Sequence, residues 1–103
     1  MNLNKSIIAG RLTSDVEFKK TASGQTISQF RVATNRFFTV KEEKKEEVEF
    51  HKVVVFGRTA EVCSQYLKKG SLVLVEGRIQ TRSYEGKAGK QFITEIIADN
   101  VQF

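Results

Sequence analysis

Apolar and polar residues alternate along much of this 103-residue chain, and the alternation predicts strands. Side chains of a strand point to its two faces in turn, so a period of two marks a half-buried strand. Five such runs are expected, at residues 5–12, 26–38, 47–56, 72–82 and 91–103. Turn signals lie between several of them, at Thr13-Ser14-Asp15, Thr21–Gly24 and Glu85–Gly89.

A helical period occurs once, between the third and fourth predicted strands. An apolar stripe at helical spacing is formed by Ala60, Cys63, Tyr66 and Leu67. Thr59 is suited to cap the start, Lys68 and Lys69 suit the negative carboxyl end, and Gly70 ends the helix. Three strands, a helix and two strands is the order of the oligonucleotide-binding (OB) fold. We therefore expect an all-β, five-stranded OB-fold barrel with one short helix and extended hairpins, forming a single domain over residues 1–103.

The charge is distributed unevenly along the chain. The formal net charge is +5, but Lys41–Glu49 holds three lysines and five glutamates, so the other 94 residues carry +7. This acidic block is expected to be a solvated loop or the frayed end of a long hairpin. A basic body favours polyanions, and nucleic acid is a commoner partner than anionic lipid where no membrane-binding amphipathic helix or lipidation signal is present.

Rings and cations share one face of two predicted strands. In the third strand, Phe50, Lys52 and Phe56 alternate with the aliphatic Val53 and Val55. In the fourth, a polar series alternates with an aliphatic one that contains Val73, Val75 and Ile79; the polar series is Arg78, Gln80, Arg82 and then Tyr84. An unpaired nucleic acid strand needs flat rings for its bases and cations for its phosphates. The alternative is that the phenylalanines are core and the arginines are ordinary surface.

The chain offers little material for catalysis. Cys63 is the only cysteine and His51 the only histidine, which argues against a disulfide, a metal site or a catalytic triad. There is no phosphate-binding glycine loop of the Walker type. We therefore expect no enzyme activity, no metal and no cofactor. No apolar run reaches the roughly 20 residues that cross a bilayer, so a cytoplasmic protein without membrane contact is expected.

Several ordered motifs resemble one protein family over almost the whole chain. They are NK at 4–5, GRLT at 10–13, FHKVVVFG at 50–57, AE at 60–61, YLKKGS at 66–71, VEGRIQTRSYE at 75–85, TE at 94–95, AD at 98–99 and VQF at 101–103. This combination resembles the bacterial single-stranded-DNA-binding proteins. The resemblance implies sequence-tolerant coating of single-stranded DNA in replication, recombination and repair, by a homotetramer associated with the bacterial nucleoid.

The resemblance also implies roles for individual residues. By motif position, the rings that stack on bases are Phe38, Phe50, Phe56 and Tyr84. Phosphate contacts are implied for some of Lys5, Arg11, Lys52, Arg58, Lys68, Lys69, Arg78 and Arg82. His51 falls at a motif position near a subunit contact. Three positions that often hold tryptophan are Phe or Tyr here, so somewhat weaker stacking is expected.

The sequence departs from the family pattern in two ways, and other functions stay open. Val16 and Ala22 stand where prolines are common, and the sequence stops at Phe103 without the acidic tip that recruits replication and repair enzymes in many members. Contacts with such enzymes are therefore expected only if the native protein has an acidic tail. An adaptor that works through protein contacts and an RNA-binding module are the alternatives.

Overall fold

The computed structural model describes residues 1–103 and contains six strands and one helix. In chain order they are β1 (Ser6–Leu12), β2 (Glu17–Lys20), β3 (Thr26–Val40), β4 (Glu43–Phe56), α1 (Arg58–Tyr66), β5 (Leu72–Gly86) and β6 (Gly89–Gln102). The nine-residue helix is far too short to cross a bilayer, and no other helix is present.

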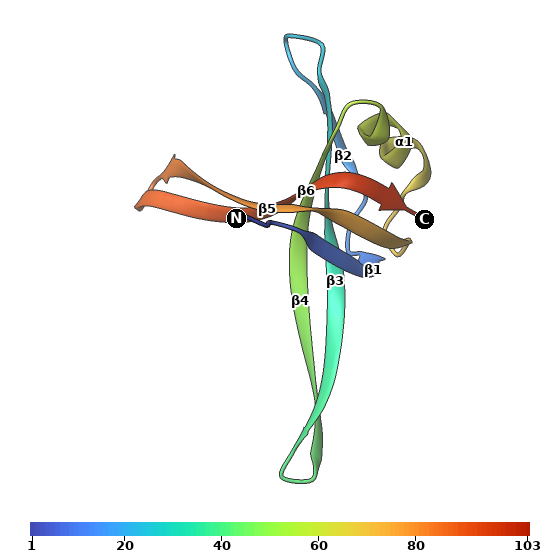
Figure 1. The fold of residues 1–103 in the computed structure, drawn as a ribbon, viewed down its shortest axis with the longest axis vertical. Helices are drawn as coiled ribbons and strands as arrows, with labels where there is room; N and C mark the ends of the chain where they lie inside the picture. The colour runs from blue at the N-terminus through green and yellow to red at the C-terminus, as the bar shows by residue number, and fades with distance from the viewer.

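Five of the strands close into a barrel. Neighbouring strands follow the order β1-β5-β6-β4-β3, and β3 pairs with β1 through Arg11 and Leu12 to complete the ring (Figure 1). The β4–β6 pairing is parallel and the others are antiparallel. The predicted five-stranded OB-fold barrel with one helix is confirmed.

Three details differ from the expectation. The short strand β2 was not predicted, because its four residues are all exposed and show no apolar alternation; it pairs with β3 outside the ring. The helix begins at Arg58 and is capped by the backbone of Gly57, so the predicted cap at Thr59 is wrong. Because the helix already ends at Tyr66, Lys68 and Lys69 lie beyond it in the connection to β5.

The barrel interior is filled by aliphatic side chains from every wall strand. Val53 and Val55 of β4 pack with Val73 and Val75 of β5, and α1 covers one end of the barrel with Ala60 and Cys63. The strand alternation therefore assigns these valines to the core correctly. Ile79 shares their side of β5 but is half exposed, because β5 continues past the barrel at that point.

Close backbone approach explains why β1 carries a glycine where the barrel closes. A Cβ atom on Gly10 would lie 2.2 Å from the carbonyl oxygen of Ala33 on β3. The obstacle is backbone and has no rotamer to change, so only glycine allows β1 to cross β3 at this spacing. The residue thus permits the pairing of Arg11 with Ala33 that completes the ring.

Two hairpins extend beyond the barrel as arms that leave it in different directions (Figure 1). The longer one, β3–β4, stays paired out to Val40 and Glu43 and turns through Lys41 and Glu42, both with positive φ. The acidic block Lys41–Glu49 is therefore the outer part of a long hairpin, one of the two forms that the sequence allows. The second arm is the β5–β6 hairpin, which turns between Gly86 and Gly89.

Candidate nucleic-acid interface

The outer side of β4 presents two phenylalanine rings to solvent. In the β3–β4 hairpin, Phe50 pairs with Ala33 and Phe56 pairs with Ile27. Val53 and Val55 occupy the inner side, which places Phe50, Lys52 and Phe56 outside the barrel. Phe50 is 59% exposed and Phe56 is 40% exposed. They are separated by six residues, or roughly 20 Å of strand.

Strand β5 contributes to the same outer surface from the other side of β6. Val73 and Val75 point inward, so the alternating residues Arg78, Arg82 and Tyr84 point outward. Tyr84 is 50% exposed. We call the surface formed by Arg31, Phe50, Lys52, Phe56, Arg82 and Tyr84 the aromatic face.

A buried carboxylate links the two strands of this face. Glu95 of β6 is only 3% exposed, and its Oε2 lies 3.0 Å from Nζ of Lys52 on β4. Nε of Arg82 on β5 donates a hydrogen bond of 2.8 Å to Glu95 Oε1, and a second guanidinium nitrogen lies 3.4 Å from Oε2. Burial disfavours ionisation of Glu95, but the hydrogen bonds and charges of Arg82 and Lys52 outweigh it and lower the pKa of Glu95. The hydrogen bond to Glu95 in turn raises the pKa of Arg82. No buried side-chain polar atom lacks a partner.

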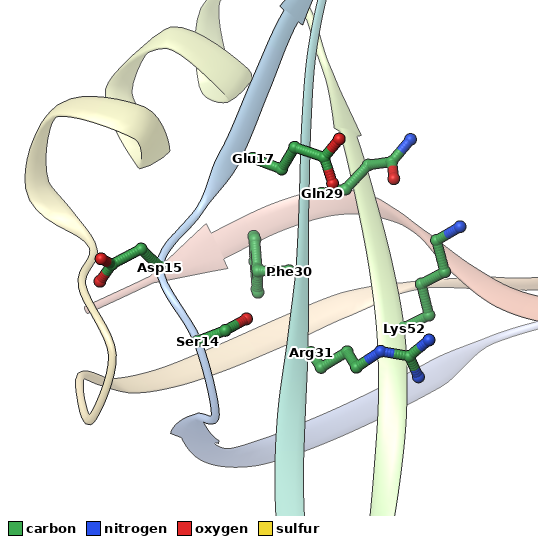
Figure 2. Close-up of a pocket in the computed structure, with 7 residues that line it drawn as sticks. All are labelled: Ser14, Asp15, Glu17, Gln29, Phe30, Arg31 and Lys52. Carbon is green, nitrogen blue, oxygen red and sulfur yellow. The ribbon is translucent and has the colours of Figure 1, made fainter.

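Arg31 is a cation that the sequence reasoning did not single out. It is paired with Lys52 across the β3–β4 hairpin and has no salt bridge. Both residues line a hollow of about 200 Å³ that also includes Ser14, Asp15, Glu17 and Gln29. Figure 2 shows Arg31 and Lys52 projecting to one side of the two strands, whereas Asp15 points to the other. The Asp15 carboxylate instead accepts a hydrogen bond of 2.9 Å from the backbone N–H of Lys69. The alternation of β3 could have identified Arg31, because it lies between the inward-facing Phe30 and Val32.

Two adjacent rings of β3, Phe37 and Phe38, lie on opposite sides of the β3–β4 hairpin. Phe38 pairs with Lys45 on the side opposite Phe50, and the Arg36 guanidinium carbon lies 4.6 Å from the centre of its ring. Phe37, which is 73% exposed, lies on the same side as Phe50. The structure therefore brings Phe50 and Phe56 to one face without Phe38, and adds Phe37, which the motif comparison did not select.

Most of the remaining cations predicted to bind phosphate have partners within the chain. The ion pairs join Lys5 to Glu76 at 3.8 Å, Arg58 to Glu61 at 3.8 Å and Arg78 to Asp99 at 3.9 Å. A guanidinium N–H of Arg11 donates a 2.9 Å hydrogen bond to the carbonyl of Gly70. Lys68 and Lys69 are exposed and unpaired in the loop after α1. These loosely held surface cations could rearrange around an anion at little cost.

His51 and Cys63 lie apart from the aromatic face. His51 points to the inner side of β4, is partly buried and lies 2.8 Å from the hydroxyl of Thr34 through its Nε2. Cys63 is completely buried on the core-facing side of α1, and burial raises the pKa of its thiol to about 11. No group of three or more histidine, cysteine, aspartate or glutamate side chains is placed to hold a metal ion.

Comparison with known proteins places this arrangement in a family. The model of the single-strand binding protein family matches residues 3–103. The chain belongs to this family. Two members from Staphylococcus aureus illustrate the likeness. Single-stranded DNA-binding protein 2 of strain COL is 47% identical over 102 residues, which are 98% of this chain and 73% of that protein. Single-stranded DNA-binding protein 1 of strain Mu50 is 46% identical over 98% of this chain and 65% of that protein. The chain thus spans about two thirds to three quarters of these relatives.

A solved structure shows the same fold in the family. The structure described as the Plasmodium falciparum SSB complex with ssDNA superposes with a TM-score of 0.88, covering 99% of this chain and 93% of that one at 29% identity. The likeness therefore extends over the barrel, the helix and both hairpins.

Proposed function

We propose that residues 1–103 form one domain that binds and coats single-stranded DNA without strong sequence preference and without catalysis. Membership of the single-strand binding protein family supports this, as do the DNA-binding names of its relatives and the single-stranded DNA in the similar solved structure. The roles proposed are protection of unpaired strands during replication, recombination and repair on the bacterial nucleoid. Partner enzymes are proposed only where the native protein carries an acidic tail.

The observation that carries the proposal is the exposure of large rings beside cations on the outside of the barrel. Phe50, Phe56 and Tyr84 are 40–59% exposed, although burying such rings is normally favourable. Each ring can stack one base, and stacking tolerates sequence because every base has a π face. We add Phe37 to this set. Phe38 lies on the opposite side of the hairpin. It therefore stacks a base only where the bound DNA strand passes around the edge of the hairpin to that side.

Cations around the rings supply the phosphate contacts. Arg31 and Arg82 lie on the aromatic face itself, and we propose them as the nearest contacts. The surface cations Lys5, Arg11, Arg58, Lys68, Lys69 and Arg78 extend the basic surface along the path of a longer strand. Lys52 is not included in the set, because its side chain is mostly buried and its ammonium is paired with Glu95.

Removing two rings tests the aromatic face. Phe50→Ala/Phe56→Ala should weaken binding of oligo(dT) by about 2–6 kcal/mol, the value of two stacked bases, in a fluorescence anisotropy titration. Phe92→Ala is the matched control, because Phe92 is an exposed ring on the side of the β5–β6 hairpin opposite Tyr84. The control should change affinity by less than about 0.5 kcal/mol.

Two outcomes would contradict the proposal. A loss below about 0.5 kcal/mol in the double variant would show that the rings do not stack on bases. Equal affinity for oligo(dT) and a matched duplex would rule out selectivity for unpaired strands. A matched RNA oligonucleotide that competes better than DNA would favour the RNA-binding alternative.

We also propose that the protein is a homo-oligomer, in the form of a tetramer. The edge of β1 from Ser6 to Gly10 that faces away from β5 has no strand partner, and open edges favour pairing with another chain. The exposed apolar residues Ile7, Leu72 and Phe103 lie on β1 or close to it. His51 lines a hollow together with Ser6 and Ile8 of β1, which would put it next to a second copy paired at that edge.

A further inference from the structure

Lys52 and Arg82 share one carboxylate but differ in their access to solvent. Both lie on the aromatic face, and both contact Glu95 at hydrogen-bonding distance, 3.0 Å for Lys52 and 2.8 Å for Arg82. The side chain of Lys52 is 16% exposed, whereas that of Arg82 is 47% exposed. The sequence predicts the same phosphate-binding role for Lys52 and Arg82. Their different exposure indicates different roles.

We propose that Glu95 is a positioning residue that keeps Lys52 from contacting phosphate and leaves Arg82 as the phosphate-binding cation of the β5 side of the aromatic face. The proposal rests on the binding of single-stranded DNA proposed above. It assigns a function to a buried glutamate that lies in the TE motif at 94–95, for which the resemblance implied no role.

The hydrogen-bonding capacity of the two cations supports this division. A guanidinium has five N–H donors in a planar fork, and Glu95 occupies the Nε side of Arg82, so its remaining edge is free and exposed to solvent. The Lys52 ammonium is a compact charge that points at a buried carboxylate oxygen. A phosphate that approached Lys52 would meet the negative charge of Glu95 behind it and would have to break a well-ordered pair.

The charges lead to the same division. Two cations and one carboxylate give the cluster a net charge of +1, which one phosphate neutralises. Glu95 thus occupies the place of a second phosphate. The cluster should release about one counterion when DNA binds, although it contains two cations.

Salt dependence measures this number directly. We would titrate fluorescein-labelled oligo(dT) at several salt concentrations between about 50 and 200 mM and compare the slopes of log K against log salt. The variants are Glu95→Gln, Arg82→Gln and the charge-neutral double variant Lys52→Met/Glu95→Gln. Each phosphate contact changes the slope by about 0.7.

Each variant has a definite expected slope. Arg82→Gln should make the slope shallower by about 0.7 for every subunit that the strand contacts. Glu95→Gln should make it steeper by about 0.7 for every contacted subunit, because Lys52 is released to bind phosphate. The double variant should keep the slope of the wild type, because it removes a neutral pair that does not contact DNA. A purely structural role for Glu95 would lower the melting temperature without moving the slope.

The outcomes separate this proposal from the one on which it rests. A wild-type protein that does not bind oligo(dT) would overturn the proposed function. Tight binding combined with a slope shallower by about 0.7 in the double variant would show that Lys52 contacts phosphate, and would overturn only this inference. An unchanged slope in Glu95→Gln would also overturn it. Arg82 is half exposed, so Arg82→Gln should fold even where a Glu95 variant does not. An unchanged slope in Arg82→Gln would by itself overturn the inference.

Discussion

Glu95 is the residue whose environment departs most from expectation for its type. Glutamate is rarely buried without charged partners, and this one has a lysine and an arginine on neighbouring strands. Sequence alternation placed Lys52 and Arg82 on outward faces, but it gave no reason to connect them. Their link depends on β6 lying between β4 and β5, and that strand order is a tertiary property. In the same way, the hairpin register determines which of the adjacent residues Phe37 and Phe38 lies on the side of Phe50.

Protonation of Glu95 at low pH should reduce the free energy of unfolding. Its pKa is lowered in the folded protein and is about 4.3 when unfolded, so its stabilising contribution is complete above about pH 4.3. The contribution is lost as the pH falls through the lower folded value. At neutral pH, Glu95→Gln should reduce the free energy of unfolding by about 1–3 kcal/mol. Urea denaturation followed by circular dichroism should show this difference shrinking as the pH is lowered from 6 toward 2. A difference that is constant over this range would contradict the assigned ion pairs.

At the scale of elements, the strands that contribute to the core were predictable and the extensions were not. The valines of β4 and β5 mark buried faces, and an apolar alternation gives such strands a clear pattern. The outer half of β4 is a run of charged residues with weak strand propensity, which the hairpin pairing overrides. The exposed strand β2 lacks an apolar face, and no sequence pattern could identify it.

The turn of the β3–β4 hairpin has a strained backbone, and substitution of its two residues should stabilise it. Lys41 and Glu42 both have positive φ, at 50° and 68°, which costs roughly 1–2 kcal/mol for each non-glycine residue. Lys41→Asn/Glu42→Gly supplies the residues preferred in a two-residue turn of this kind. Hydrogen exchange of the outer hairpin amides should slow by about tenfold, the equivalent of about 1.4 kcal/mol. Lys41→Ala/Glu42→Ala removes the same charges without favouring the turn. Equal exchange in both variants would contradict the turn geometry.

At the scale of the whole molecule, the barrel is closed but β1 keeps one open edge. The chain forms every core contact within a single copy, and an exposed apolar strip remains along β1 and the end of β6. Ile7 and Leu72 lie on the side of their strands opposite the core residues Leu12, Val73 and Val75. The sequence could not reveal this strip, because residues 7–8 and 72–75 are all apolar and alternation does not distinguish the two sides there. Their exposure results from the direction in which β1 and β5 face, which only the assembled barrel determines.

The open edge predicts a defined change in mass. Light scattering should give a multiple of the 11.7 kDa chain mass, with four copies expected. Ile7→Asp places a charge on the exposed strip and should lower the mass toward that of one chain. Val40→Asp, at the exposed tip of the long hairpin, is the control and should keep the wild-type mass. A wild-type protein of 11.7 kDa in solution would contradict assembly through β1.

The buried thiol has a practical consequence for following this molecule by optical methods. Cys63 is inaccessible, and its pKa of about 11 leaves almost no thiolate at neutral pH. A cysteine introduced at the hairpin tip, as in Lys41→Cys, would therefore react with a maleimide dye while Cys63 stays unmodified. Because the chain has no tryptophan, site-selective conjugation of this kind would supply a spectroscopic reporter that the native sequence lacks.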